Sequence, residues 1–223
     1  MLVDLDAQAN ATLGIGIKYQ QLEHALYDAL TGGCPLEDVI CPTVFEGLHL
    51  LPSSADLAAL DVYLAGLENR EYSLKTCLAP LESYYDYILI DCPPSLNLAT
   101  VNALVFATDV LIPVQCEFYA MEGMTKLLKT VQLIRQSLNP GLHILGILMS
   151  MYDRRLSLHR QVVADVREHF QSLVFETLIP RNVRLAEAPS HGMPIQLYNR
   201  NSKGALSYAQ LTKELMSRYE TVR

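Results

Sequence analysis

Acidic residues stand where apolar runs end, and their placement suits chemistry on phosphate groups. In residues 87–95, an apolar run ends at Asp91 and is stopped by Pro93 and Pro94. A β-branched run between polar residues predicts a buried parallel strand, and open α/β sheets bind ligands at the carboxyl ends of such strands. A carboxylate there can hold Mg²⁺ through its water shell beside the phosphates of a nucleotide. The alternative is an aspartate that only ends a strand or caps the next helix, and this segment alone leaves both open.

A second pair of carboxylates, Asp4 and Asp6, follows the apolar residues at the start of the chain. Side chains alternate along an extended chain, so both carboxylates are expected on the same face of this strand. Two carboxylates at the carboxyl end of a strand can together position a metal ion and a water molecule. The alternative is a pair that only caps the structure that follows.

The elements that must position these carboxylates alternate along the chain. Apolar periodicity and turn residues predict helices over residues 21–30, 55–67, 70–82, 96–106, 117–138, 157–171 and 204–220. Besides the strand at the start, apolar runs predict strands over residues 47–51, 87–91, 110–114, 143–149 and 175–179, with Pro113 marking a strand end. This alternation predicts an α/β fold, a doubly wound and mostly parallel sheet with helices on both faces, in a single domain over residues 1–223.

The composition excludes several classes of protein. Half of the residues are hydrophobic and 18% are charged, which excludes a disordered chain. No apolar run approaches the roughly eighteen residues of a membrane span, and no signal-peptide pattern is present, so we expect a cytoplasmic protein without a membrane partner. The five cysteines include no CxxC pair and indicate reduced thiols, and the six scattered histidines do not indicate a zinc site. No GxGxxG follows a strand, which disfavours a dinucleotide-binding oxidoreductase.

The charge is distributed unevenly along the chain. Residues 1–120 carry 3 Lys and Arg against 16 Asp and Glu, whereas residues 121–223 carry 14 against 8. An acidic chain with a net charge of -7 can therefore still present a basic surface to nucleic acid.

Four separated stretches carry a resemblance to a known family. They are residues 2–12 (LVDLDAQANAT), 87–95 (YILIDCPPS), 114–123 (VQCEFYAMEG) and 179–192 (IPRNVRLAEAPSHG). Together and in this order, they resemble the ParA/Soj family of chromosome and plasmid partition ATPases, which are deviant Walker-type P-loop ATPases related to MinD. The similarity covers essentially the whole chain.

The resemblance implies roles for the carboxylates. Asp6 matches the aspartate that positions the attacking water and would be catalytic. Asp91 matches the Walker B aspartate, and Asp4 would support the same Mg²⁺ ion through water. Pro93 would lie in the loop that senses the γ-phosphate of ATP.

The resemblance also implies contacts with adenine and with DNA. The family contacts adenine at positions that four residues occupy here, namely Met151, Pro180, Arg181 and Asn182. Arg155 and Arg184 match arginines that bind DNA without sequence preference. Both lie in the half of the chain with the positive balance. Each could instead be a solvated surface charge.

One part of the family pattern is absent from this sequence. In the family, a phosphate-binding loop precedes the segment that begins here, but no glycine precedes any of the six lysines, so no GxxxxGK[ST] match exists. We therefore expect a chain that is truncated at its N-terminus and lacks the first strand-loop-helix unit of the fold. Such a chain is expected to leave strand edges unpaired, to be marginally stable and to be unable to hydrolyse ATP alone.

The sequence leaves two main hypotheses open. In the first, the chain is the body of a ParA-type ATPase whose complete form binds ATP and Mg²⁺, forms a homodimer and coats nucleoid DNA. A ParB-type partner would stimulate its hydrolysis of ATP. In the second, it is a naturally short, non-hydrolysing protein that binds DNA or a full-length paralogue. A MinD-like membrane-cycling ATPase is less favoured, because residues 206–223 have the mixed charge and apolar stripe of a core-packing helix.

Overall fold

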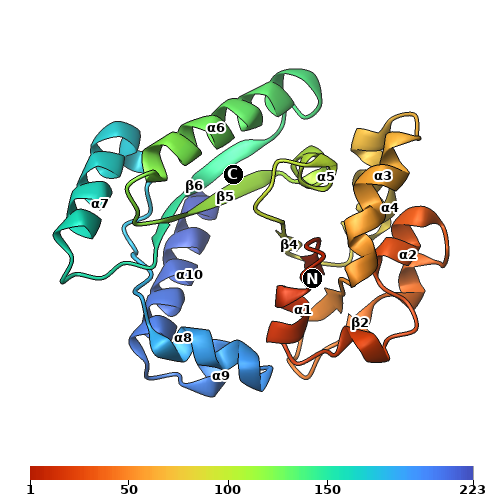
Figure 1. Cartoon of the computed structure of the whole chain (residues 1–223), viewed down its shortest axis with the longest axis horizontal. Coiled ribbons are helices and arrows are strands. Elements are labelled where there is room, and N and C mark those ends of the chain that lie inside the picture. Colours follow the sequence, from red (N-terminus) through yellow and green to blue (C-terminus); the bar gives the residue numbers. More distant parts are fainter. Residues whose placement is uncertain (223) are drawn as a thin grey trace. The chain divides into compact units, whose positions relative to one another are not determined.

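The computed structural model describes residues 1–222, and the chain divides into two compact units (Figure 1). The first unit contains Met1–Ala107 and Pro189–Met193. The second contains Thr108–Ala188 and the described residues from Pro194 onward. The single domain expected over residues 1–223 stays a prediction. Arg223, the last residue of the C-terminal segment considered above, lies outside the described residues.

Strands and helices alternate as the sequence predicts, and the α/β class with mostly parallel strands is confirmed. The strands are β1 (Leu2–Asp4), β2 (Cys41–Pro42), β3 (His49–Leu51), β4 (Leu89–Asp91), β5 (Asp109–Gln115) and β6 (His143–Ser150). The α-helices are α1 (Asn10–Gly14), α2 (Leu26–Thr31), α3 (Leu60–Ala65), α4 (Ser73–Leu78), α5 (Leu98–Phe106), α6 (Ala120–Ser137), α7 (Ser157–Phe170), α8 (Val183–Glu187), α9 (Ile195–Tyr198) and α10 (Lys203–Val222).

The first unit is built on a sheet with the strand order β2-β3-β1-β4. β3 and β4 both run parallel to β1, and β2 runs antiparallel to β3. Val3 of β1 and Leu51 of β3 are buried in one core with leucines of α2, α3 and α4, namely Leu26, Leu60, Leu64, Leu74 and Leu78. Because burying each such leucine contributes about 1.5–3 kcal/mol, this core holds the ends of β1 and β4 in place.

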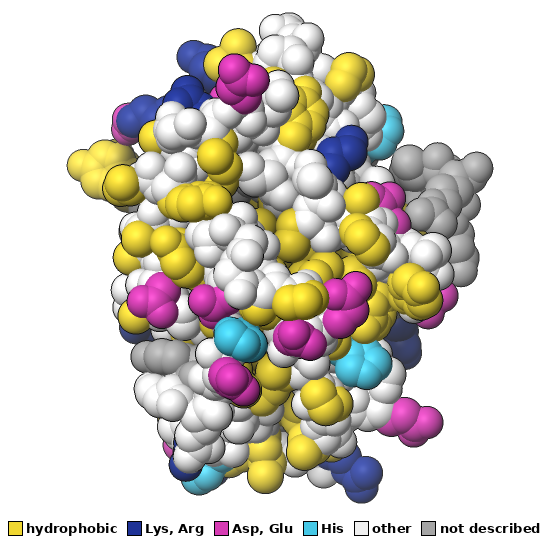
Figure 2. All heavy atoms as spheres, turned by 90° about the vertical axis from the view of Figure 1, so that its right-hand side faces the viewer, with side chains coloured by type: hydrophobic (Ala, Val, Ile, Leu, Met, Phe, Trp, Pro, Cys, Tyr) yellow, Lys and Arg dark blue, Asp and Glu magenta, His cyan; other side chains and the backbone are white. Residues whose placement is uncertain are grey.

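The prediction that residues 87–91 form a buried strand is only half right. β4 is parallel to β1, as expected, but the described chain places no strand on its other side, and Leu89 is 63% exposed. An apolar run cannot distinguish a central strand from an apolar edge strand, because the run does not show how many neighbours it has. Figure 2 shows further exposed hydrophobic side chains, among acidic ones, on one face of the molecule. The low stability expected for such a chain stays a prediction.

The second unit has helices on both faces of its sheet, in which β5 and β6 are parallel (Figure 1). Ile147 and Met149 of β6 pack with residues of α6 and α7, whereas Leu148 packs with Phe175 and with Leu211 of α10. Adjacent residues of β6 therefore face opposite helical layers, as the period of two in a strand requires.

Two strand predictions in the second unit are wrong in detail. Residues 175–179 follow β6 without forming a regular strand, although the N–H of Phe175 donates to the Ile147 carbonyl at 2.9 Å. Side chains of α10 bind backbone groups in and next to this segment: Glu214 accepts from the N–H groups of residues 176 and 177, and Arg218 donates to the carbonyls of residues 173 and 174. β5 continues through Pro113, which an edge strand tolerates because no neighbour needs its missing N–H.

The predicted helices of the first unit are shorter than expected. The helix expected from residue 21 begins at Leu26, where Asp28 accepts the N–H of Ala25 at 2.8 Å. It ends at Gly32 as predicted, with a φ of 76° that suits glycine. The helices expected over residues 55–67 and 70–82 each contain a short α-helix preceded or followed by 3-10 turns.

Candidate functional site

Three acidic residues meet where β1 and β4 end. Asp4 and Asp91 are direct partners in the parallel pairing of these strands, and the N–H of Leu5 donates to the Asp91 carbonyl at 2.8 Å. Asp6 lies two residues beyond the end of β1. It is therefore in the loop and not on the strand, where the sequence predicted it. The structure therefore brings Asp4, Asp6 and Asp91 to one edge of the sheet.

Asp4 is completely buried and is held by hydrogen bonds. Its Oδ2 accepts hydrogen bonds from the N–H and from the hydroxyl of Thr12, both at 2.7 Å, and its Oδ1 accepts the N–H of Asp6 at 3.3 Å. The hydroxyl of Thr12 in turn accepts the N–H of Ser53 at 3.1 Å. Asp4 thus fastens α1 and the loop after β3 to the end of β1.

The sequence did not single out Thr12 or Ser53. Thr12 is eight residues from Asp4, and Ser53 is a further 41 residues along the chain. No periodic pattern relates these positions. A buried carboxylate needs hydrogen-bond donors around it. This requirement was the only signal in the sequence that Asp4 must have partners elsewhere in the chain.

The loop that carries Asp6 is tightly constrained. The Asp6 carboxylate accepts the N–H of Gln8 at 3.0 Å, and the backbone carbonyl of Asp6 accepts the hydroxyl of Ser53 at 2.6 Å. Ala9, buried in the same loop, has a φ of 54°, a left-handed conformation that costs a residue with a side chain about 1–3 kcal/mol. Such strain is a feature of loops whose shape matters for a site.

The charges around Asp91 are unbalanced. Partial burial of the carboxyl group, and then the negative charges of Asp4 and Asp6, raise the pKa of Asp91 to about 6. In the described part of the chain, no lysine or arginine forms an ion pair with Asp91. A carboxylate with two acidic neighbours and no cation is a suitable partner for a divalent cation.

The residues fit a hydrated Mg²⁺ ion better than a directly coordinated one. Within residues 1–222, no group of three His, Cys, Asp or Glu side chains is arranged to hold a metal ion. Asp4 is completely buried and its carboxylate accepts three hydrogen bonds, so it is less accessible to an ion than Asp91 is. Asp91, whose residue is exposed at the end of β4, is the carboxylate that can face the water shell of an ion.

The loop that contains Pro93 leaves Asp91 and is anchored at the start of α5. The hydroxyl of Thr100 donates to the Ser95 carbonyl at 2.7 Å. The side chain of Asn97 accepts the N–H of Thr100 at 3.1 Å and caps the helix. Pro93 itself is half-buried.

The four residues predicted to contact adenine lie in the second unit, on two segments that the backbone joins. The N–H of Tyr152 donates to the Ile179 carbonyl at 3.0 Å, and the N–H of Arg181 donates to the Tyr152 carbonyl at 2.9 Å. This places Met151 and residues 180–182 on adjoining segments. Met151 has a φ of 54°, and the Asn182 side chain caps α8 by accepting the N–H of residue 184 at 2.8 Å.

Arg155 and Arg184 are carried by the same two segments. Both guanidinium groups are exposed, and each forms an ion pair with a nearby carboxylate. Arg155 pairs with Asp153 at 2.6 Å, and Arg184 pairs with Glu187 at 2.7 Å. The structure therefore holds the two arginines on adjoining segments of one unit.

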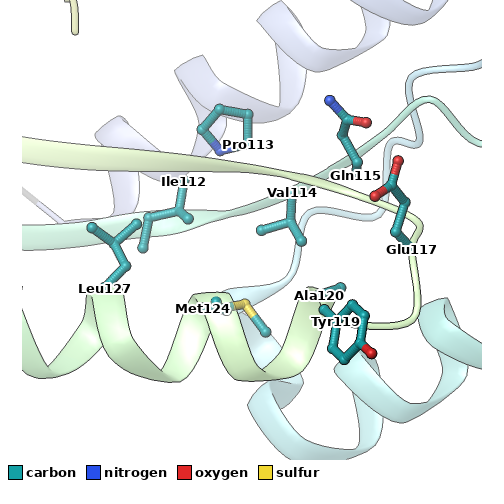
Figure 3. Close-up of a pocket in the computed structure, with 10 residues that line it drawn as sticks. Ile112, Pro113, Val114, Gln115, Glu117, Tyr119, Ala120, Met124 and Leu127 are labelled. Atoms are coloured by element: carbon teal, nitrogen blue, oxygen red, sulfur yellow. The ribbon is translucent and has the colours of Figure 1, made fainter. Parts of the chain in front are cut away.

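A cavity of about 380 Å³ lies between β5 and α6 (Figure 3). Ile112 and Val114 point toward α6, whereas Pro113 and Gln115 point away from it. The cavity is lined by Ile112, Pro113, Val114, Gln115, Glu117, Tyr119, Ala120, Gly123, Met124 and Leu127. Most of these residues belong to the stretch 114–123, to which the sequence assigned no role.

Comparisons with known proteins agree with the fold. The family model described as an AAA domain matches residues 1–144. The chromosome partitioning protein ParA of Myxococcus xanthus is 48% identical over 218 residues, which cover 98% of this chain and 77% of the relative. The sporulation initiation inhibitor protein Soj of Bacillus subtilis is 47% identical over 215 residues, which cover 96% of this chain and 85% of the relative.

A solved structure gives the same picture. The cobyrinic acid a,c-diamide synthase of Mycobacterium smegmatis, crystallised with ADP and magnesium, superposes with a TM-score of 0.84 at 34% identity. The match covers 100% of this chain and 83% of that one. No described helix of the present chain is long and apolar enough to cross a membrane.

The parallel strands, with carboxylates at their carboxyl ends, define an α/β protein of the P-loop NTPase type. Within that class, the chain belongs to the ParA/Soj family of partitioning ATPases.

Proposed function

We propose that this chain acts in chromosome or plasmid partitioning as a ParA-type ATPase. In its complete form it binds ATP and Mg²⁺, forms a homodimer and binds DNA without sequence preference. The observation that carries the proposal is the unbalanced set of carboxylates at the ends of β1 and β4, in a chain 48% identical to a ParA protein.

The carboxylates have separate tasks in this proposal. Asp91 accepts hydrogen bonds from water molecules around Mg²⁺, and Asp4 keeps α1 and the Asp6 loop in place beside it. Asp6 orients the water molecule that attacks the γ-phosphate. Pro93 restricts the loop that follows Asp91 and thereby couples it to the phosphate. The magnesium ion, when bound, neutralises charge on the phosphate oxygens.

The second unit supplies the remaining contacts. Met151, Pro180, Arg181 and Asn182 contact adenine, and Arg155 and Arg184 bind DNA phosphates. A ParB-type partner stimulates hydrolysis, and the protein is cytoplasmic and associated with the nucleoid. The backbone hydrogen bonds between residues 152 and 179–181 support this assignment, because they join two segments that each carry adenine-contacting residues and one of the arginines.

We propose further that the 223-residue chain does not hydrolyse ATP by itself, because its sequence contains no GxxxxGK[ST] motif to cradle the phosphates. A phosphate-release assay with Mg²⁺ and ATP should give the background rate, both for the wild type and for Asp6→Ala. Release that exceeds background and is lost in Asp6→Ala would show that the chain carries a working site.

DNA binding provides the test of the proposal as a whole. Fluorescence anisotropy with a labelled duplex of arbitrary sequence should show binding that weakens as salt rises, with a log-log slope of about -0.9 for each phosphate contact. Arg155→Ala and Arg184→Ala should each weaken binding for every duplex tested. Arg135→Ala removes the same charge from an exposed residue in the last turn of α6, elsewhere on the second unit, and serves as the control for net charge.

The outcomes separate the two main hypotheses. No binding, or equal binding by the arginine variants, would overturn the proposed DNA contacts. Tight binding that ATP does not alter would favour the second candidate, a short protein that binds DNA or a paralogue without hydrolysis. That candidate is supported by the exposure of both arginines in a chain without a phosphate loop.

A further inference from the structure

The two arginines proposed to bind DNA share a local arrangement. Each donates hydrogen bonds to a carboxylate that lies within three residues of it in the sequence. Arg155 donates from Nη2 to Asp153 Oδ2 at 2.6 Å and from Nε to Asp153 Oδ1 at 3.0 Å. Arg184 donates from Nη1 to Glu187 Oε2 at 2.7 Å.

The protein holds the Asp153 carboxylate more firmly than it holds the arginine. The Asp153 side chain is 16% exposed, whereas that of Arg155 is 83% exposed. The N–H of Asp153 donates to His159 Nδ1 at 3.0 Å, and Asp153 Oδ1 also accepts the N–H of Arg155 at 3.0 Å. The carboxylate is therefore the less exposed member of the pair, and the guanidinium is the more exposed one.

Glu187 is held in a similar way. Its Oε2 accepts both the Arg184 guanidinium and the hydroxyl of Tyr198, the latter at 3.1 Å. Glu187 is on the last turn of α8 and Tyr198 is on α9. The arrangement recurs on two separate segments with different spacing, since the carboxylate precedes one arginine and follows the other. Exposed Arg154, Arg181 and Arg200 form no ion pair in the described chain.

A carboxylate and a phosphate bind arginine through the same kind of hydrogen bonds. Both accept paired hydrogen bonds from the planar guanidinium, so one occupies donors that the other would use. DNA must therefore displace a carboxylate from each arginine, or share the donors with it. Resting on the proposed function, we propose that Asp153 and Glu187 compete with DNA phosphates for Arg155 and Arg184 and thereby lower the affinity for DNA.

The expected size of the effect follows from the exposure of the pairs. Exposed ion pairs are weak, so removing one competing charge should raise the affinity by about two- to fivefold. When DNA displaces the carboxylate from its arginine, the carboxylate attracts cations from solution. This uptake of cations partly cancels the release of counterions from the DNA. Removing the carboxylate charge should therefore steepen the salt dependence by up to about 0.9 in the log-log slope.

The test compares conservative variants in the same anisotropy assay. Asp153→Asn keeps an oxygen that can accept the N–H of residue 155, and Glu187→Gln keeps one for the Tyr198 hydroxyl. Each should bind the duplex about two- to fivefold more tightly than the wild type, with a steeper salt slope, and the double variant more tightly than either. Glu168→Gln removes the same charge from α7 and should leave the slope unchanged. Circular dichroism verifies that each variant is folded.

The possible results separate this inference from the proposed function. Weaker binding by Asp153→Asn would mean that the carboxylate positions Arg155 rather than competes for it, and would overturn the inference. Equal gains in Asp153→Asn, Glu187→Gln and Glu168→Gln would reduce the effect to net charge and overturn it as well. If, in addition, Arg155→Ala and Arg184→Ala bind DNA as tightly as the wild type does, both the inference and the proposed DNA contacts are refuted. If those two lose affinity while the carboxylate variants gain none, only the competition is refuted.

Discussion

Asp91→Asn should stabilise the protein, and by an amount that depends on pH. The pKa of Asp91 rises from its ordinary value of 3.8 to about 6 in the folded chain, because of partial burial and then the charges of Asp4 and Asp6. One pKa unit corresponds to about 1.4 kcal/mol, so the full rise would cost the folded state about 3 kcal/mol. Since Asp91 is an exposed residue whose charge water screens, we expect a cost of about 1–2 kcal/mol.

The sign of the pH dependence follows from proton linkage. Below a pH of about 3.8, the carboxyl group is protonated in both the folded and the unfolded chain, so it contributes no penalty. As the pH rises from there to about 6, the unfolded chain loses the proton first, and the folded state becomes less stable. The penalty is complete above that range.

Urea unfolding at a series of pH values measures this penalty. The chain contains no tryptophan, so circular dichroism is the suitable signal. The stability advantage of Asp91→Asn over the wild type should be small well below pH 3.8 and should reach about 1–2 kcal/mol above pH 7. Glu82→Gln, on an exposed residue of the first unit, controls for net charge. An advantage that is absent at high pH, or equal at every pH, would refute the raised pKa of Asp91.

Three further substitutions test the packing around the site and in the second unit, each by urea unfolding. Thr12→Val removes the hydroxyl that donates to the buried carboxylate at the end of β1, and should cost about 1.5–3 kcal/mol; a loss no greater than that of Thr125→Val, on the exposed side of α6, would contradict this. Gly192→Ala places a methyl group 2.6 Å from a backbone carbon and should cost about 1–3 kcal/mol more than Gly47→Ala, which has a similar φ but open space; equal costs would argue against the close approach. Arg218→Ala leaves three backbone carbonyls without their donor and should cost about 3 kcal/mol; a cost below about 1 kcal/mol would show that water replaces the guanidinium.

The long elements of the second unit were predictable from the sequence. α6, α7 and β6 lie within a few residues of the predicted ranges, because the two helices have long apolar patterns of helical period and β6 is a long apolar run. The segment 175–179 has an equally strand-like pattern but forms no regular strand. The N–H groups of residues 176 and 177 in this segment donate to Glu214 of α10, about forty residues further along the chain. A local pattern carries no information about such partners.

The candidate site was predictable in its parts. The sequence placed Asp4 and Asp91 at the ends of two strands, because an apolar run followed by an acid and a turn is a local pattern. The residues that hold Asp4, namely Thr12 and Ser53, could not be found in this way. Their contacts arise because α1 and the loop after β3 fold back over the end of β1.

The sequence alone determined the alternation of strands and helices, the carboxylates at the strand ends and the positive charge of the second half of the chain. These properties depend on the type and spacing of nearby residues, which act through backbone geometry and burial. Only the tertiary structure decided that β1 lies beside β4, so that partial burial and then the charges of Asp4 and Asp6 raise the pKa of Asp91, and that Leu89 of β4 is exposed. These strand partners and charge neighbours depend on contacts between segments that lie far apart in the chain. The spacing of residues in the sequence does not determine such contacts.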